Sequence, residues 1–427
     1  MWLYCRRNRP LLNNFFVVVR SPNRRQYNHT VTTNMTVKMD FEEEALLLLL
    51  LQRKMRRRKK RQFWVHPIIE NKNESQFNLL YNSLRMYDDK FLNYFRMSKN
   101  SFDYLLCELT DIIKRTDTTM RKSIPADERL ALTIRYLATG CSFKELHYTY
   151  KCGSTTASEI VRDVCRQIWF KLQPIHLSKP NKEKWQDIAQ QFKSRANFPN
   201  CLGAVDGKHI RIIHPPNSGS LYWNYKHFFS IVLLAVCDSN YLFTYVDIGA
   251  YGKTSDSTIW KDSSLYKKMK KNELDLPDPE IISMDGNRLP YVFIGDEAFG
   301  LNEHMLRPYS GRQISEKKRV FNYRLSRARR YVECSFGILA NKWRILHRPL
   351  NVAVDFAEDI VKACVVLHNI VRKQDGYNYE DTLMTPDFIP FENNEEYRVG
   401  RSVNLVRDKF ADYFISPEGE LHWQYTM

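Results

Sequence analysis

The sequence of 427 residues lacks the features that define several classes of protein. No CxxC pair occurs among its nine cysteines, and their odd number and wide scatter argue against a disulfide framework or a zinc knuckle. The longest apolar run near the N-terminus, at 45–51, covers about seven residues, whereas a membrane-spanning helix needs about 20. We therefore expect an intracellular protein with reduced, mostly buried thiols and no membrane partner.

Acidic residues are scarce in two segments, and these segments account for the net charge of +17. Residues 1–61 hold 15 Lys/Arg and four acids, and residues 319–348 hold eight Lys/Arg and the single acid Glu333. The rest of the chain is close to neutral. Such a charge indicates an anionic partner, nucleic acid or a membrane surface. With 43% hydrophobic residues, the chain can also bury a sizeable core and form two or three domains.

Residues 1–75 are expected to form a basic, largely disordered leader. Residues 1–38 contain seven Lys/Arg and no acid, which fits a mitochondrial presequence; alternatively, translation starts at Met39. Residues 53–61 read RKMRRRKKR, and like charges at this density repel one another and favour an extended segment. This run indicates a nuclear localisation signal or a phosphate-binding arm, with a solvated basic helix face as the alternative.

Residues 76–180 predict an all-α region, because apolar residues recur there at helical spacing. Two short helices, at about 142–146 and 154–164, flank a tight turn at Gly153 in a helix-turn-helix-like pattern. In a DNA-binding module of this kind, Thr155, Thr156 and Ser158 would face the duplex. A helical packing bundle is an equally good interpretation, because the second helix carries no cation before Arg162.

From residue 200 the pattern changes from helices to strands. The apolar runs 201–205, 230–236 and 242–248 predict three successive strands of an antiparallel meander, and 291–294 predicts a further strand. A long helix is expected at about 320–346. We therefore predict an α/β domain over 200–372, with a mixed sheet flanked by helices. A C-terminal tail over 373–427 is acidic at first and ends in a helix at 403–414.

Three acids stand out chemically. Asp206 and Asp296 each follow a short apolar strand, where a carboxylate is costly unless it is paired or bound to a cation. Glu333, in a helix crowded with cations, is either a salt-bridge hub or a metal ligand. Three carboxylates brought together would repel one another, and Mg²⁺ or Mn²⁺ relieves this repulsion. Two such ions about 3.5–4 Å apart can activate a water and stabilise the leaving oxygen in phosphodiester cleavage.

Four segments in this order carry a family resemblance: GAVDGKHIRI (203–212), GAYGKTSDSTIW (249–260), LPYVFIGDEAFGL (289–301) and RRYVECSFGILANKWRIL (329–346). They resemble the PIF/Harbinger transposases and the Harbinger transposase-derived nucleases, which are DDE superfamily endonucleases with an RNase H-like fold. The likeness covers about 88–372. It implies that Asp206 and Asp296 are the catalytic aspartates, that Glu333 is the catalytic glutamate, and that these three bind divalent metal together with Asp256. The alternative role for Asp256 is to cap a helix that begins near Ser257.

The resemblance also implies a function. It predicts a metal-dependent DNA endonuclease or transposase that leaves a 3′-OH, works with a Myb/SANT-like DNA-binding protein and can form a homo-oligomer. The basic run 53–61 predicts that the protein resides in the nucleus, with the cytoplasm as a second location. One alternative is a domesticated DNA-binding or scaffold protein without catalysis, and another is an RNA-directed RNase H-like hydrolase. Basic side chains near the acids are candidates for contact with DNA phosphates. They are Lys208, Arg324, Arg327, Arg329 and Arg330.

Overall fold

The structure is a computed structural model of the chain. It describes residues 40, 45–50, 63, 65–119, 122–282, 288–311, 314–376 and 401–425. The basic run 53–61 and most of the predicted leader lie outside these residues. Residues 45–50 are helical, and Pro67–Met427 forms a compact unit distinct from Met1–His66. No helix in the described ranges is both long enough and apolar enough to cross a membrane.

The first part of the compact unit is helical, as predicted. It contains α2 (Pro67–Glu70), a 3₁₀ turn η1 (Lys72–Glu74), α3 (Gln76–Met86), α4 (Asp88–Phe95), α5 (Lys99–Ile113), α6 (Ala126–Thr139), α7 (Phe143–Thr149) and α8 (Ser154–His176). The Ser98 hydroxyl caps α5 by accepting from the Ser101 amide. Gly140 ends α6 with a φ of +69°, a left-handed conformation that glycine adopts without steric cost.

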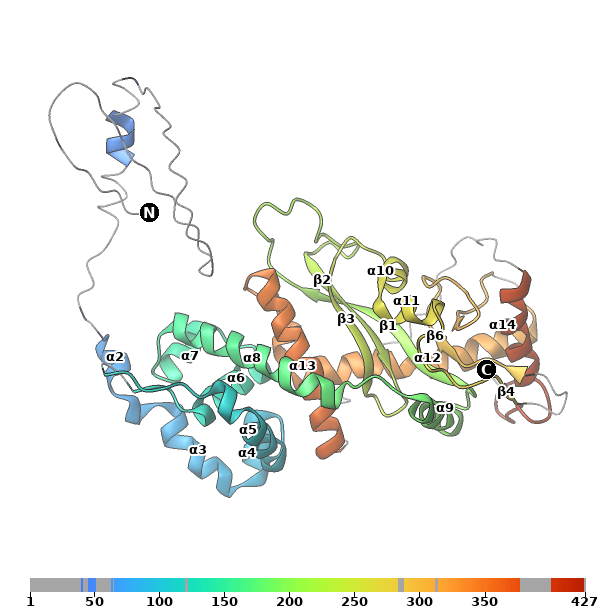
Figure 1. Ribbon diagram of the computed structural model, residues 1–427, viewed down its shortest axis with the longest axis horizontal. Coiled ribbons are helices and arrows are strands. Elements are labelled where there is room, and N and C mark those ends of the chain that lie inside the picture. The colour runs from blue at the N-terminus through green and yellow to red at the C-terminus, as the bar shows by residue number, and fades with distance from the viewer. Residues whose placement is uncertain are drawn as a thin grey trace. The chain divides into compact units, whose positions relative to one another are not determined.

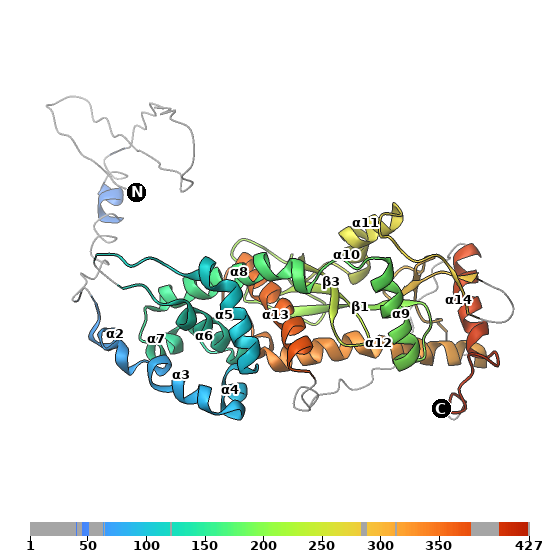
Figure 2. The same cartoon turned by 60° about the horizontal axis from the view of Figure 1, so that its bottom comes forward.

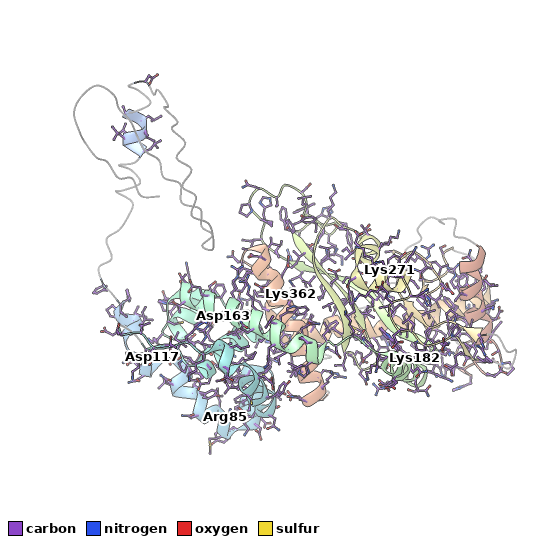
Figure 3. The ribbon with its side chains drawn as sticks, viewed as in Figure 1. Arg85, Asp117, Asp163, Lys182, Lys271 and Lys362 are labelled. Atoms are coloured by element: carbon purple, nitrogen blue, oxygen red, sulfur yellow. The ribbon has the colours of Figure 1, made fainter. Side chains whose placement is uncertain are left out.

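Ion pairs tie these helices to one another. The Asp163 carboxylate of α8 accepts from Arg115 and from Arg129 of α6, each at 2.7 Å. Arg85 of α3 makes two parallel hydrogen bonds of 2.7 Å to Asp103 of α5. Figure 3 labels Arg85 and Asp163 in these helices. Bidentate and shared pairs of this kind orient the helices more firmly than single surface pairs do.

Helices α7 and α8 have the predicted helix-turn-helix order. Helix α8, however, is also engaged with α13 (Val354–Gln374), because Arg162 pairs with Asp355 and Arg166 with Asp359. Helix α13 also packs against strand β3 (Phe243–Tyr251) of the sheet, so it joins the helical region to the sheet. Thr155 is exposed at the start of α8, and its contact with DNA stays a prediction.

The sheet confirms the predicted α/β fold class. Helix α9 (Lys182–Ala196) leads into β1 (Cys201–Arg211), β2 (Ser230–Cys237) and β3 (Phe243–Tyr251), and β6 (Val292–Ile294) and β7 (Met305–Leu306) follow. The strand order is β3-β2-β1-β6-β7. β1, β2 and β3 form the antiparallel meander, whereas β6 and β7 pair in parallel. β4 (Glu280–Ile281) and β5 (Arg288–Leu289) form a separate ribbon.

Helices cover both faces of this sheet (Figures 1 and 2). On one face, the ring of Phe243 lies 6.0 Å from Phe336 of α12 (Glu316–Lys342) and 4.8 Å from His368 of α13. On the other face, the ring of Phe293 lies 5.7 Å from Trp260 of α10 (Asp256–Asp262) and 5.8 Å from Trp185 of α9. Helix α11 (Ser264–Lys270) follows α10 directly. The buried apolar strands predicted from the sequence are therefore covered on both sides.

The end of the chain packs onto α12. A 3₁₀ turn η2 (Arg344–His347) follows that helix, and α14 (Arg401–Phe414) confirms the helix predicted at 403–414. The rings of Phe410 and Phe414 lie 5.8 and 5.1 Å from that of Phe198, which precedes β1. Among the described cysteines, eight are free thiols and most are buried, as expected.

Candidate active site

Two of the predicted acids lie at the same level of the parallel strand pair. Ala204 of β1 pairs with Ile294 of β6, and β6 ends there. Asp206 and Asp296 each come two residues after this pair. The sequence places Asp206 after a strand, but β1 continues through it to Arg211 and pairs Asp206 with Ala235 of β2. Asp206 therefore lies where β1 loses its parallel neighbour, a position in which a rigid strand holds its carboxylate beside the Asp296 turn.

A third aspartate, Asp256, approaches Asp206 from helix α10. The Ser255 hydroxyl accepts from the Thr258 amide and caps this helix, so the alternative role of Asp256 as the cap is excluded. Asp256 is instead the first residue of α10, and its carboxylate lies against the backbone of Gly207. A Cβ atom at position 207 would overlap that carboxylate. The glycine after Asp206 therefore gives Asp256 the space to approach β1.

The raised pKa values of Asp206 and Asp256 show that both carboxylates lie within reach of the Asp296 charge. Burial raises the pKa of Asp206 to about 7, opposed by the Arg329 guanidinium and reinforced by the carboxylates of Asp296 and Asp256. Burial and the charge of Asp296 raise the pKa of Asp256 to about 6, against the lowering effect of Lys226. Because nearby like charges disfavour the ionised form, the three carboxylates form a cluster in need of positive charge.

Glu333 lies on α12 and is engaged differently. Its side chain is 35% exposed and forms an ion pair with Arg329, one helical turn earlier. The charge of Arg329 also favours the ionised form of Asp206, so this guanidinium acts on both acids. Among the residues that the structure describes, no three His, Cys, Asp or Glu side chains are close enough to hold one metal ion. The structure thus gathers Asp206, Asp256 and Asp296 within electrostatic range of one another, although not closely enough to share one ion, and pairs Glu333 with an arginine.

The predicted DNA contacts separate into distinct environments. Arg324 is only 2% exposed, and its guanidinium donates to the carbonyl oxygens of Asn197 and Gly419 and to Gln424 Oε1. Its assignment as a DNA contact is therefore wrong, because the C-terminal segment covers this side of α12. Arg330, by contrast, is exposed.

The other two cations each lie over an aromatic ring. The Arg327 guanidinium is 4.7 Å from the ring centroid of Trp423. The Lys208 ammonium is 5.7 Å from that of Phe336, and burial lowers the pKa of Lys208. Both residues keep a partly exposed surface, so DNA contact by Arg327 and Lys208 stays a prediction.

The loop between β1 and β2 is a feature that the sequence analysis missed. Its Lys226 ammonium lowers the pKa values of Asp256, Lys208 and His209, which places it beside the acids. Next to it, Tyr225 is 74% exposed. The interleaved aromatic and basic residues of 223–228 were the available signal, because such mixtures are typical of surfaces that bind single-stranded nucleic acid.

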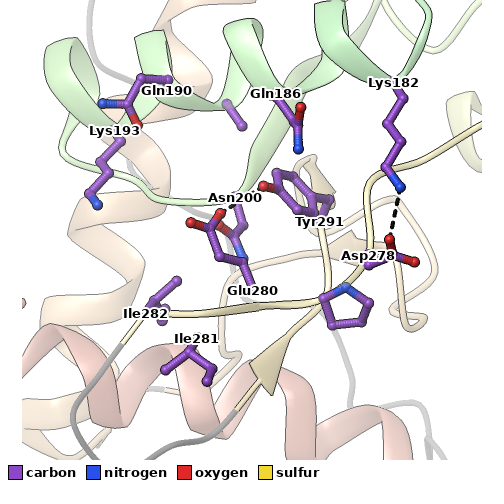
Figure 4. Close-up of a pocket in the computed structure, with 12 residues that line it drawn as sticks. Lys182, Gln186, Gln190, Lys193, Asn200, Asp278, Glu280, Ile281, Ile282 and Tyr291 are labelled. Carbon is purple, nitrogen blue, oxygen red and sulfur yellow. Dashed lines mark hydrogen bonds and ion pairs between the residues drawn. The ribbon is translucent and has the colours of Figure 1, made fainter.

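A cavity of about 560 Å³ lies between α9 and the β4–β5 ribbon (Figure 4). It is lined by side chains of both signs, including Lys182, Lys193 and Glu280. Lys182 pairs with Asp278 at 2.8 Å, and the Tyr291 hydroxyl donates to Glu280 at 2.7 Å. None of the four predicted acids lines this cavity, so it is separate from the candidate active site.

Comparisons with known proteins match the region of the chain that contains this site. Residues 205–369 match the model of the DDE superfamily endonucleases, and this segment contains Asp206, Asp256, Asp296 and Glu333. The resemblance to Harbinger transposase-derived proteins is confirmed. The chain is 26% identical to "Protein ALP1-like" of Arabidopsis thaliana over 75% of this chain and 80% of that protein. It is 21% identical to human "Putative nuclease HARBI1" over 72% and 84% of the two chains. No solved structure matches the chain.

Proposed function

We propose that the DDE endonuclease domain is a divalent-metal-dependent DNA nuclease of the PIF/Harbinger type, which hydrolyses phosphodiester bonds and leaves a 3′-OH. The observation that carries this proposal is the cluster of Asp206, Asp256 and Asp296, held by β1, α10 and the turn after β6. Burial and the neighbouring carboxylates raise the pKa values of Asp206 and Asp256, so their charges are costly to keep without positive charge nearby. Perturbed acids of this kind are typical of catalytic sites.

The donor set suits Mg²⁺ or Mn²⁺, because hard cations prefer carboxylate oxygens. We assign Asp206, Asp256 and Asp296 as ligands whose carboxylates would draw closer around the bound ions, with Glu333 joining them once its ion pair with Arg329 opens. Two bound ions would supply the activation of water and the stabilisation of the leaving oxygen. The chain itself contributes the rigid strand under Asp206, the glycine that admits Asp256 and the cation at Arg329.

The proposal includes a setting for this activity. Exposed Arg330 would hold DNA phosphates beside the cluster. The basic run 53–61 would direct the protein to the nucleus, and a Myb/SANT-like protein would supply sequence recognition. The last two points rest on the sequence and on the family resemblance.

A cleavage assay tests the proposal. Asp206→Asn, Asp296→Asn and Glu333→Gln should each remove Mg²⁺-dependent nicking of plasmid DNA, with circular dichroism unchanged. The matched control is Asp262→Asn, an exposed aspartate at the other end of α10, which should cleave like the wild type. Full cleavage by any of the three active-site variants would refute the assignment.

The same assay separates the nuclease from its alternative. Wild-type protein that binds DNA but never cleaves it with Mg²⁺ or Mn²⁺, with or without the partner protein, would identify a DNA-binding or scaffold protein without catalysis.

A further inference from the structure

We propose that the loop between β1 and β2 is a stacking platform for one unpaired nucleobase of the DNA strand at the acid cluster. This inference rests on the proposed nuclease function and names a substrate feature that the acids do not specify. The platform is formed by Trp223, Tyr225 and Lys226. Tyr225 is 74% exposed and Trp223 is 41% exposed, so both keep aromatic surface open to solvent.

The loop is held in one shape by the buried side chain of Asn224, which is 2% exposed. Its Oδ1 atom accepts from the amides of Lys226 at 2.9 Å and Phe228 at 3.3 Å. Its Nδ2 atom donates to the Ser230 hydroxyl at 2.9 Å. The backbone N–H of Asn224 also donates to the backbone carbonyl of Phe228 at 3.0 Å. With the turn fixed on both sides of Tyr225, little conformational entropy remains to be lost on binding.

Trp223 is also held in place, by its neighbour Phe229. Its ring meets that of Phe229 edge-on, at 4.9 Å and 67° between planes, and a backbone bridge joins the two residues. The aromatic surface of this loop is therefore built on the end of β2 and keeps its orientation when one exposed ring is removed.

Contacts with β1 place the platform beside the acids. The ring of Tyr225 meets that of His209 edge-on at 5.5 Å. His209 follows Gly207, the residue against which Asp256 lies, by two positions on the same face of β1. Two residues of a strand span about 7 Å.

The chemistry of the platform fits a nucleobase followed by a phosphate. The Lys226 ammonium lies 5.3 Å from the ring centroid of Tyr225, so an aromatic face and a cation are presented together. Arg211, an exposed residue of β1, adds a second cation over the Phe228 ring at 4.8 Å. A base inside a duplex has both faces covered by its neighbours, whereas an unpaired base can leave the stack and lie on a protein ring. The occupant is therefore an unpaired base rather than a base pair.

The test compares two labelled DNA duplexes with the full-length protein at constant salt and without Mg²⁺. One duplex is fully paired, and the other carries a single unpaired 2-aminopurine. Tyr225→Ala should lower affinity for the second duplex by about 5- to 100-fold, as expected for one lost base–aromatic stack, and leave the first within about twofold. The loss of the stack should also restore 2-aminopurine fluorescence. Tyr225→Phe should behave like the wild type.

The control variant is Tyr87→Ala, because Tyr87 is similarly exposed at 66% but lies at the start of α4. It should change neither affinity. Equal losses for both duplexes, or no loss with Tyr225→Ala, would overturn the stacking platform while leaving the nuclease proposal intact. A change in oligomeric state without a change in DNA binding would assign the loop to a second copy of the chain and also overturn it. Wild-type protein that binds neither duplex and cleaves no DNA would overturn both proposals.

Discussion

Replacing Asp206 by Asn should stabilise the protein at pH 8 in metal-free buffer. The folded state holds this carboxylate with a pKa of about 7, whereas the ordinary value is 3.8, because burial and two neighbouring aspartates disfavour its ionised form. Asparagine keeps the shape and can still accept the hydrogen bond from the Gly207 amide, measured at 2.9 Å in the wild type. It removes the charge that the fold must tolerate above neutral pH.

The size of the effect follows from proton linkage. Between about pH 4 and pH 7 the folded state retains a proton that the unfolded state has released, so stability falls as pH rises through this window. Each pH unit is equivalent to about 1.4 kcal/mol, which sets a limit of about 4 kcal/mol. Asp206 is only partly buried and Arg329 can adjust, so we expect about 2 kcal/mol.

Urea denaturation of both proteins at pH 4 and pH 8, with EDTA present, measures this difference. The advantage of Asp206→Asn should be near zero at pH 4, grow towards pH 7 and level off above it. Added Mn²⁺ should stabilise the wild type and leave the variant almost unchanged, because the variant has lost a ligand. A variant that is less stable than the wild type at pH 8, or an advantage that does not depend on pH, would refute the reasoning.

Two further predictions concern residues on either side of the cluster. Arg324→Met should lower the free energy of unfolding by about 3 kcal/mol, because buried acceptors lose a charged donor, and should leave DNA affinity unchanged. Arg330→Met should leave the free energy of unfolding unchanged and weaken DNA binding in the same two assays. Weaker DNA binding by Arg324→Met at full stability would contradict the burial argument. Gly207→Ala should reduce plasmid nicking by about 100-fold with an unchanged circular dichroism spectrum, because the new methyl displaces the Asp256 carboxylate. Gly300→Ala is the control, since a Cβ there meets only Lys261 at 3.9 Å, and equal activities of the two variants would show that Asp256 is not needed in place.

Much of the fold could be predicted because it depends on local patterns. Continuous apolar runs identified β2 and β6, and helical spacing identified the all-α region that contains α5. The helix at the end of the chain was also predicted within two residues of its observed start. Such patterns reflect the periods of the strand and the helix, which a single sequence displays directly.

The candidate site could be predicted less completely. Asp206 and Asp296 were recognised because each acid interrupts apolar sequence, and a cost of that kind is visible without a structure. A capping role for Asp256 stayed open in the sequence, because Ser255 and Asp256 are both good capping residues, and the structure gives that role to Ser255. The loop carrying Tyr225 was overlooked, since nothing in its local pattern says that it lies beside Asp256.

The sequence by itself determined which segments are strands and helices, which carboxylates are candidates for chemistry and which family the motifs resemble. Only the tertiary structure decided that Asp206 and Asp296 stand at one level, because the parallel register joins strands that are far apart in the chain. It also decided that Arg324 is buried and Arg330 exposed on the same helix. The physical reason is that local periods set each element, whereas long-range packing chooses the face that each side chain presents.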